Sequence, residues 1–236
     1  MLFLFLGFWQ LERHDERQVR NTAIEARSVE PSRPLSALIV DHGLDDAALA
    51  HRKTTVVGSY RSDGEFLSVG RIYGDLVGTL VATPLDLEDG TVLIVLRGLA
   101  PPGVDGPPAL GYEVPRGRVS LQGTIGEGEA PLRIGESDPP SGTIESISRI
   151  DLTYIDKWVD GTVLPFTLLL ESQSPPSAAE PTPIPPEELS DGSHLGYAVQ
   201  WFAFAVIATI GIIALLRKAA RIEATGEVDE GRGLSA

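Results

Sequence analysis

A long run without a charged side chain constrains this chain more than any other feature. It extends from Leu195 to Leu216, and Arg217 and Lys218 follow it directly. At 1.5 Å per residue, a helix of this length measures about 33 Å, which is enough to cross the roughly 30 Å hydrocarbon core of a bilayer. We therefore predict a transmembrane helix at residues 194–216, surrounded by a lipid bilayer.

Basic residues lie on only one side of this span. Arg217, Lys218 and Arg221 follow it, whereas no lysine or arginine occurs between Lys157 and Arg217. The positive-inside rule then predicts that residues 217–236 form a cytoplasmic tail and that everything before the span lies outside the cytoplasm.

The chain also begins with an apolar segment at residues 1–11, MLFLFLGFWQL. A helix of this length reaches about 16 Å, only half of a bilayer. The segment lacks the basic first region and the small-residue cleavage site of a signal peptide. We interpret it as the second half of a truncated first transmembrane helix whose start lies upstream of Met1. A half-length interfacial anchor is the alternative.

Composition excludes several function classes. The net charge is −14 and the pI is about 4.6. Nucleic acid is therefore not an expected partner, because phosphate binding needs a basic face. The chain contains no cysteine, which removes disulfides, thiol redox chemistry and thiolate metal sites. Delivery of Cu(I) is also disfavoured, because this ion prefers sulfur ligands and the chain has one methionine and no cysteine.

Residues 22–173 have the pattern of one extracytoplasmic domain rich in β-strands. Glycine and proline turns separate short runs rich in β-branched residues, at 53–60, 65–73, 77–83, 91–97, 118–125 and 162–172. Short strands with frequent turns favour a mainly antiparallel sheet, sandwich or small barrel. The expected fold class is thus a membrane protein in which two transmembrane α-helices flank a β-rich α+β domain.

Finer features of this domain can also be predicted. Two helices are expected, at residues 45–52 and 147–159. Residues 174–193 form a Pro-rich linker before the span. The core should contain apolar residues at the middle of strands, namely Val56, Val81, Ile94, Val95 and Leu121.

No common enzyme motif is present, so we predict that the protein is not an enzyme. The patterns HExxH, GxSxG, GxxxxGK and GxGxxG are all missing. His42 and His51 lie nine residues apart among aspartates, which is not a same-face helical spacing. We favour solvated surface residues over a metal site there.

Polar and aromatic residues gather where the two apolar segments meet the outer membrane surface. At helical spacing, His194, Tyr197 and Trp201 share one face of the second span. The helix N-terminus favours a neutral imidazole at His194, which is the form that ligates haem iron. Gln200 is a polar side chain within the apolar run and would be costly unless it faced a partner. Trp9 and Gln10 end the first segment near the same membrane face. An aromatic belt with an interfacial histidine is the alternative interpretation.

The same segments resemble a known family. LGFWQLER at residues 6–13 and SHLGYAVQWFAFA at residues 193–205 are similar to the two membrane-flanking motifs of the surfeit-locus family of cytochrome c oxidase assembly factors. The intervening motifs follow in the order of that family: VGSY (57–60), TLVATPL (79–85), VLIVLRGLAPPG (92–103) and VSLQGTI (119–125). One departure is Leu99 after Arg97 and Gly98, where the family typically has tryptophan.

This resemblance implies an assembly factor for haem-copper cytochrome c oxidase in a bacterial plasma membrane. Bacterial members have been linked to binding haem a and passing it to the catalytic subunit. The histidine that opens their second span is the candidate iron ligand, and it corresponds to His194. By this reading the cofactor is haem a, held transiently at residues 194, 197, 200 and 201 with residues 9 and 10. The expected partners are the oxidase catalytic subunit and other respiratory-chain proteins.

Two alternatives remain open at the level of sequence. The protein could be a structural partner that braces the oxidase or a respiratory supercomplex without a cofactor. It could instead be a membrane-anchored ligand-binding module, although the tail after Arg221 is too short to form a signalling domain.

Overall fold

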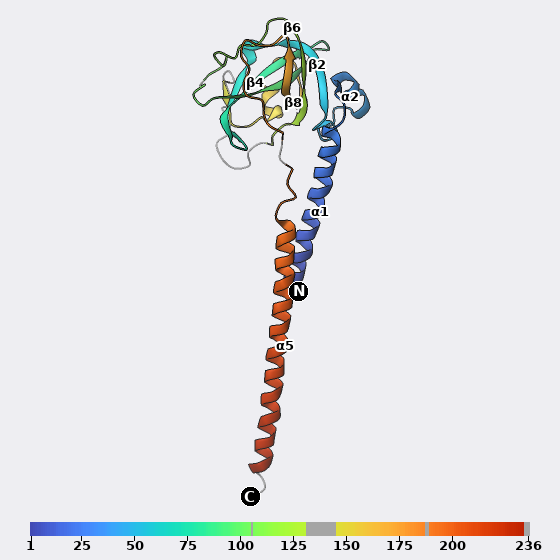
Figure 1. Ribbon diagram of the computed structural model, residues 1–236, viewed down its shortest axis with the longest axis vertical. Coiled ribbons are helices and arrows are strands. Elements are labelled where there is room, and N and C mark those ends of the chain that lie inside the picture. The colour runs from blue at the N-terminus through green and yellow to red at the C-terminus, as the bar shows by residue number, and fades with distance from the viewer. Residues whose placement is uncertain (105, 131–144, 187–188, 234–236) are drawn as a thin grey trace. The chain divides into compact units, whose positions relative to one another are not determined.

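The computed structural model describes residues 1–104, 106–130, 145–186 and 189–233, with side chains as far as residue 221. These residues form two compact units, one of residues 1–23 with 188–236 and one of residues 24–187 (Figure 1). The helices are α1 (Leu2–Ser28), α2 (Leu35–His42), α3 (Asp46–Leu49), α4 (Leu152–Ile155), α5 (His194–Gly233) and the short 3-10 turn η1 (Ser62–Gly64). The strands are β1 (Arg33–Pro34), β2 (Lys53–Tyr60), β3 (Phe66–Tyr73), β4 (Leu76–Leu87), β5 (Thr91–Ala100), β6 (Arg118–Glu127), β7 (Ser146–Ile147) and β8 (Thr162–Ser174).

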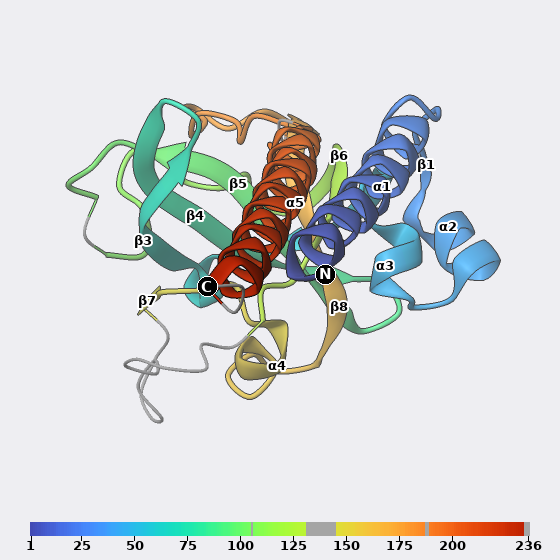
Figure 2. The ribbon, with the colours of Figure 1, turned by 90° about the horizontal axis from the view of Figure 1, so that it is seen from below.

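Five strands of the second unit form a closed ring. Neighbours pair in the order β2-β6-β8-β5-β4, and β4 returns to β2 through the pairs Gly58–Leu87, Ser59–Asp86 and Tyr60–Leu85. Most pairings are antiparallel, but β5 and β8 run parallel, as do β1 with β2 and β3 with β7. The sheet is therefore mixed, and its ring closure makes a small barrel with β3 and β7 attached outside β4 (Figure 2).

Alternation along the strands divides most of the buried apolar residues into an inner and an outer core, and a third, smaller cluster contains Leu67, Val81, Ala100 and Ala109. On β5, Leu93 and Val95 point into the barrel, whereas Ile94 and Leu96 pack on its outer face. This period of two is what a pleated strand imposes when both of its faces are buried. The inner core takes residues from all five ring strands and from α2 and α3, while the outer core lies under α4 and β7. The five predicted core residues, Val56, Val81, Ile94, Val95 and Leu121, are all buried.

The six predicted strands are confirmed, with β4 and β5 extending several residues further than expected. The helix predicted at 147–159 is wrong over most of its length. Ser146 and Ile147 pair with β3, and the Asp151 side chain accepts hydrogen bonds from Thr153 N and Tyr154 N, so helix α4 begins only at Leu152. Similarly, the Asp45 side chain caps α3, which spans only Asp46–Leu49 of the predicted 45–52.

The first unit contains the apolar segments of the chain. Helix α1 does not end with its apolar part at residue 11 but continues to Ser28. Among the described residues, one helix is long and apolar enough to cross a membrane, at His194–Arg221 with a mean hydropathy of 2.3. The first transmembrane helix stays a prediction, because α1 does not meet this test.

Candidate functional site

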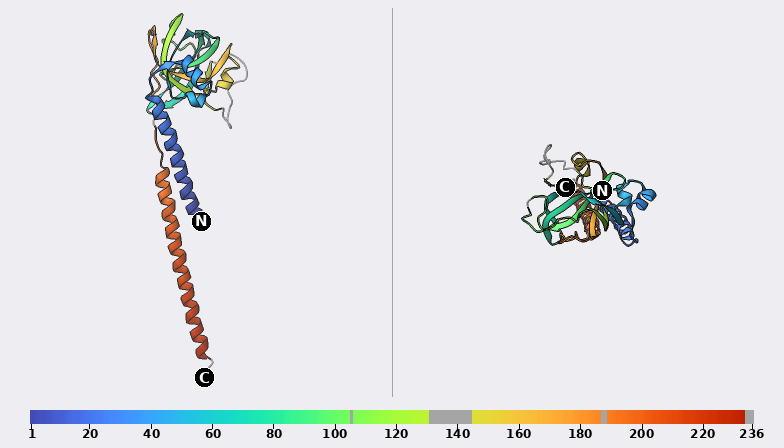
Figure 3. Two further views of the ribbon diagram at one scale, coloured as in Figure 1. Left: turned by 90° about the vertical axis from the view of Figure 1, so that its right-hand side faces the viewer. Right: turned by 90° about the horizontal axis from the view of Figure 1, so that it is seen from above.

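Helices α1 and α5 lie side by side in the first unit and run in opposite directions (Figure 3). Four contacts show the direction, because rising numbers on α1 meet falling numbers on α5 and on the residues just before it. The pairs are Asn21 with Asp191, Gln10 with His194, Gly7 with Phe202, and Phe3 with Phe204. On α1, Phe3, Gly7 and Gln10 are four and three residues apart, and Asn21 lies eleven residues after Gln10, which equals further steps of four, three and four. This is the spacing of a helix–helix seam.

Close approach of the two helices depends on small residues. A Cβ placed on Gly7 would lie 2.6 Å from the Phe202 ring, so glycine lets that ring pack against the α1 backbone. Ala198 on α5 is 1% exposed. Small residues at such positions allow helix backbones to approach closely within a membrane.

The seam brings together two of the predicted site residues, His194 and Gln10. The Nδ1 atom of His194 lies 2.9 Å from Oε1 of Gln10. Because an amide oxygen can only accept a hydrogen bond, Nδ1 is the donor in this contact. In a neutral ring with the proton on Nδ1, Nε2 is the nitrogen that can bind a metal. Histidines that ligate metals are commonly oriented in this way by a partner on the other ring nitrogen.

A glycine lies beside the free edge of this imidazole. Gly192 has a φ of +69°, and a Cβ on it would be 3.4 Å from Nε2 of His194 and 4.0 Å from Cδ of Arg17. A larger residue would crowd the Cδ2–Nε2 edge of the ring, since Cδ2 would lie 3.2 Å from that Cβ, and it would also be strained at this φ. The local backbone therefore leaves the edge of the imidazole that could bind a metal uncrowded.

The other predicted residues are arranged more loosely around this pair. Trp201 stacks on Phe3 with ring centroids 5.9 Å apart, and Tyr197 is 50% exposed one turn after His194. Trp9 faces outward beneath the Arg13 guanidinium. Gln200 is exposed, and no hydrogen bond to its side chain occurs among the described residues. Thus His194 contacts Gln10, whereas Trp201 and Trp9 contact side chains other than His194.

Sequence reasoning missed two basic residues of the seam, His14 and Arg17. The Nδ1 atom of His14 is buried and has no hydrogen-bond partner among the described residues. Arg17 follows three residues later, beside Gly192. The signal that could have found them is the four-three repeat of α1, which passes from Gln10 through both positions to Asn21.

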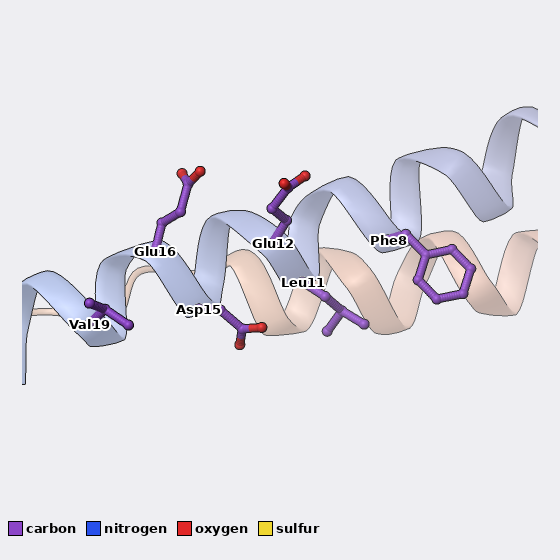
Figure 4. Close-up of a pocket in the computed structure, with 6 residues that line it drawn as sticks. All are labelled: Phe8, Leu11, Glu12, Asp15, Glu16 and Val19. Atoms are coloured by element: carbon purple, nitrogen blue, oxygen red, sulfur yellow. The ribbon is translucent and has the colours of Figure 1, made fainter.

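A hollow along α1 is a poorer candidate site. Figure 4 shows its lining, which consists of Phe8, Leu11, Glu12, Asp15, Glu16 and Val19. Three of these six side chains are carboxylates, which would repel an anionic ligand. Over the described residues, no group of three or more His, Cys, Asp or Glu side chains could hold a metal ion.

The barrel unit contains a separate buried charge network. Arg97 Nη1 donates to Glu65 Oε2 at 2.9 Å, and both side chains are nearly inaccessible to solvent. Glu65 also accepts from Thr83 Oγ1 and from the backbone N of Ala109, while Arg97 Nη2 donates to the carbonyl O of Tyr112. Burial raises the pKa of the Tyr60 hydroxyl, whose ring lies below the Arg97 guanidinium. The network ties the loop after β5 to the sheet.

Comparison with known proteins identifies the family of this chain. The sequence pattern of the SURF1 family matches residues 1–206. The chain belongs to the SURF1 family. Uncharacterized SURF1-like proteins of Mycobacterium bovis and of two strains of Mycobacterium tuberculosis are each 23% identical over 214 residues, covering 90% of this chain and 77% of the relative.

The family match bears on both halves of the candidate site. It includes α1, the barrel and the start of α5, so Gln10 and His194 both lie within it. Proteins of the SURF1 family are linked in general to the assembly of cytochrome c oxidase and are not catalytic enzymes.

Proposed function

We propose that this protein is an assembly factor for haem-copper cytochrome c oxidase that binds haem a at the outer membrane face and assists its insertion into the catalytic subunit. The observation that carries the proposal is the hydrogen bond between His194 Nδ1 and Gln10 Oε1, which leaves Nε2 free beside Gly192. Neutral imidazole in this tautomer is the protein ligand that haem iron commonly takes.

The residues around His194 fit a large, apolar, anionic macrocycle. Tyr197 and Trp201 provide aromatic surface on the same helix, and Phe3 and Trp9 provide it on α1. The side chain of Arg17, which carries positive charge, reaches the same glycine, Gly192, as the imidazole does. When bound, haem supplies an iron centre that the oxidase requires for electron transfer and oxygen chemistry. The residues of this chain orient one imidazole and shield one side of the ligand.

Transfer to a partner requires that the ligand can leave again. A single imidazole at the exposed start of α5 holds a ligand less tightly than an enclosed pocket with two axial ligands would. Gln10 orients the imidazole through one neutral hydrogen bond, which contributes only about 1 kcal/mol. This arrangement suits a carrier that receives haem and releases it to the catalytic subunit.

We further propose that the protein resides in a bacterial plasma membrane as a multi-pass protein, with the barrel outside and the C-terminus in the cytoplasm. The basic residues Arg217, Lys218 and Arg221 after the apolar part of α5 support this orientation.

Because the chain contains no cysteine, single cysteines can test this orientation. Leu110 is 82% exposed in the barrel unit, and Ala220 is exposed beyond the apolar run. In intact cells without an outer-membrane barrier, a membrane-impermeant maleimide should label Leu110→Cys but not Ala220→Cys. After the cells are lysed, the maleimide should label Ala220→Cys as well. The reversed pattern would rule out the orientation.

The function itself is tested with the purified full-length protein. Isolated in mild detergent from cells that make haem a, it should show haem absorbance and should co-purify with the oxidase catalytic subunit. Membranes that lack the protein should contain less haem a in the oxidase. Co-purification of oxidase without haem absorbance, and with no haem uptake on titration, would instead favour the structural-partner interpretation.

A further inference from the structure

We infer that Arg17 is the anion-binding residue of the His194 site and receives a carboxylate of the ligand whose iron His194 takes, a role that rests on the proposed haem binding. Arg17 Cδ and His194 Nε2 both lie within van der Waals reach of one point, the Cβ position of Gly192. Haem has an iron at its centre and carboxylates at its edge, and this site presents an imidazole and a cation together.

The charge of Arg17 is not used within the described part of the chain. The neighbouring Arg13 pairs with Glu16, while Arg17 has no hydrogen bond or ion pair among the described residues. The nearby carboxylate of Asp191 accepts instead from Asn21 Nδ2 at 3.0 Å. An arginine that lines a helix seam without a carboxylate partner has its donors available for an anionic ligand.

The surroundings select which end of the ligand reaches Arg17. The side of α1 towards its N-terminus is aromatic at Phe3 and Phe8, whereas Arg17 lies towards the polar part of the helix. At a membrane surface, an amphipathic ligand directs its apolar edge towards lipid and its carboxylates towards water.

The test compares two ligands on the full-length protein in detergent, ferric haem and ferric haem with both propionates esterified. Titration is followed in the Soret absorbance. The variants are Arg17→Gln, Arg17→Lys and His194→Ala. Arg33→Gln is a control that removes the same charge from an exposed ion pair with Asp41 on the barrel unit.

We expect Arg17→Gln to weaken the binding of free haem about tenfold, as loss of one charge-assisted hydrogen bond does. Its Soret maximum should stay at the wild-type position, because the iron ligand is unchanged. Arg17→Lys should recover part of the affinity, since it keeps the charge and loses the fork of donors. Esterification should weaken binding to the wild-type protein about tenfold and should have no further effect in Arg17→Gln.

The two proposals fail in different ways. Equal affinity of Arg17→Gln and Arg33→Gln for free haem, together with loss of binding in His194→Ala, would overturn the role of Arg17 and leave the haem site intact. An equal effect of esterification in the wild-type protein and in Arg17→Gln would overturn it as well. No haem binding by the wild-type protein, or unchanged binding and an unchanged Soret maximum in His194→Ala, would overturn the proposed function and this inference with it.

Discussion

Replacing Arg97 by methionine is expected to lower the free energy of unfolding of the barrel unit by about 3–5 kcal/mol. The substitution keeps an apolar stem of similar length but leaves the Glu65 carboxylate buried without its cation. It also removes the donor to the Tyr112 carbonyl, so the loop after β5 loses one of its ties to the sheet. The measurement is thermal or chemical unfolding of the full-length protein in detergent, followed by circular dichroism at β-sheet wavelengths.

Two controls identify the cause of this loss. Arg97→Met combined with Glu65→Leu should recover a large part of the stability, because the unpaired charge is then gone. Arg33→Gln breaks an exposed ion pair and should cost less than about 1 kcal/mol. If Arg97→Met cost no more than Arg33→Gln, the buried pair would not exist as described.

Replacing Ile94 by aspartate should prevent the protein from accumulating at all. Ile94 is fully buried in the middle of β5, opposite Pro84 on β4 and Thr167 on β8. A carboxylate there has no partner in the outer core, so we expect a loss of several kcal/mol and degradation in cells. Immunoblotting of membranes against wild type provides the measurement.

Ile72→Asp is the matched control, since Ile72 lies on β3 of the same sheet but is 69% exposed. It should accumulate normally. Normal levels of Ile94→Asp, with normal oxidase assembly, would show that β5 does not lie in the core.

The strands could be predicted because their signal is local. Alternation of β-branched residues between glycine and proline turns located all six long strands, and mid-strand residues such as Val95 are buried as expected. Ring closure could not be predicted, because the pairing of Tyr60 with Leu85 and the parallel pairing of β5 with β8 join segments that no local pattern connects. The burial of Arg97 could not be predicted either, since a charged residue within a strand usually lies on a solvent-exposed face.

Part of the candidate site could likewise be predicted from the sequence, and part of it could not. Sequence spacing placed Gln10 and His194 near one membrane face, and the structure joins them by a hydrogen bond. The continuation of α1 to Ser28 and the position of Arg17 beside Gly192 were not predicted. They depend on how far the helix extends past its apolar part and on which face it turns towards α5, and neither follows from the apolar segment alone.

The central claim is that His194 ligates haem iron, and a haem titration of His194→Ala tests it most directly. The variant should insert and fold, because the alanine side chain fits at the start of α5 and leaves the Trp201 and Phe3 stack in place. Trp201→Ala provides the comparison, since it removes packing surface and leaves the imidazole. Titrated in detergent beside the wild-type protein, His194→Ala should lose haem binding or bind haem at least about a hundredfold more weakly. Trp201→Ala should weaken haem binding less. The oxidase spectrum of membranes that contain His194→Ala should lose the haem a signal. Unchanged haem affinity in His194→Ala, with a normal oxidase spectrum, would contradict the account.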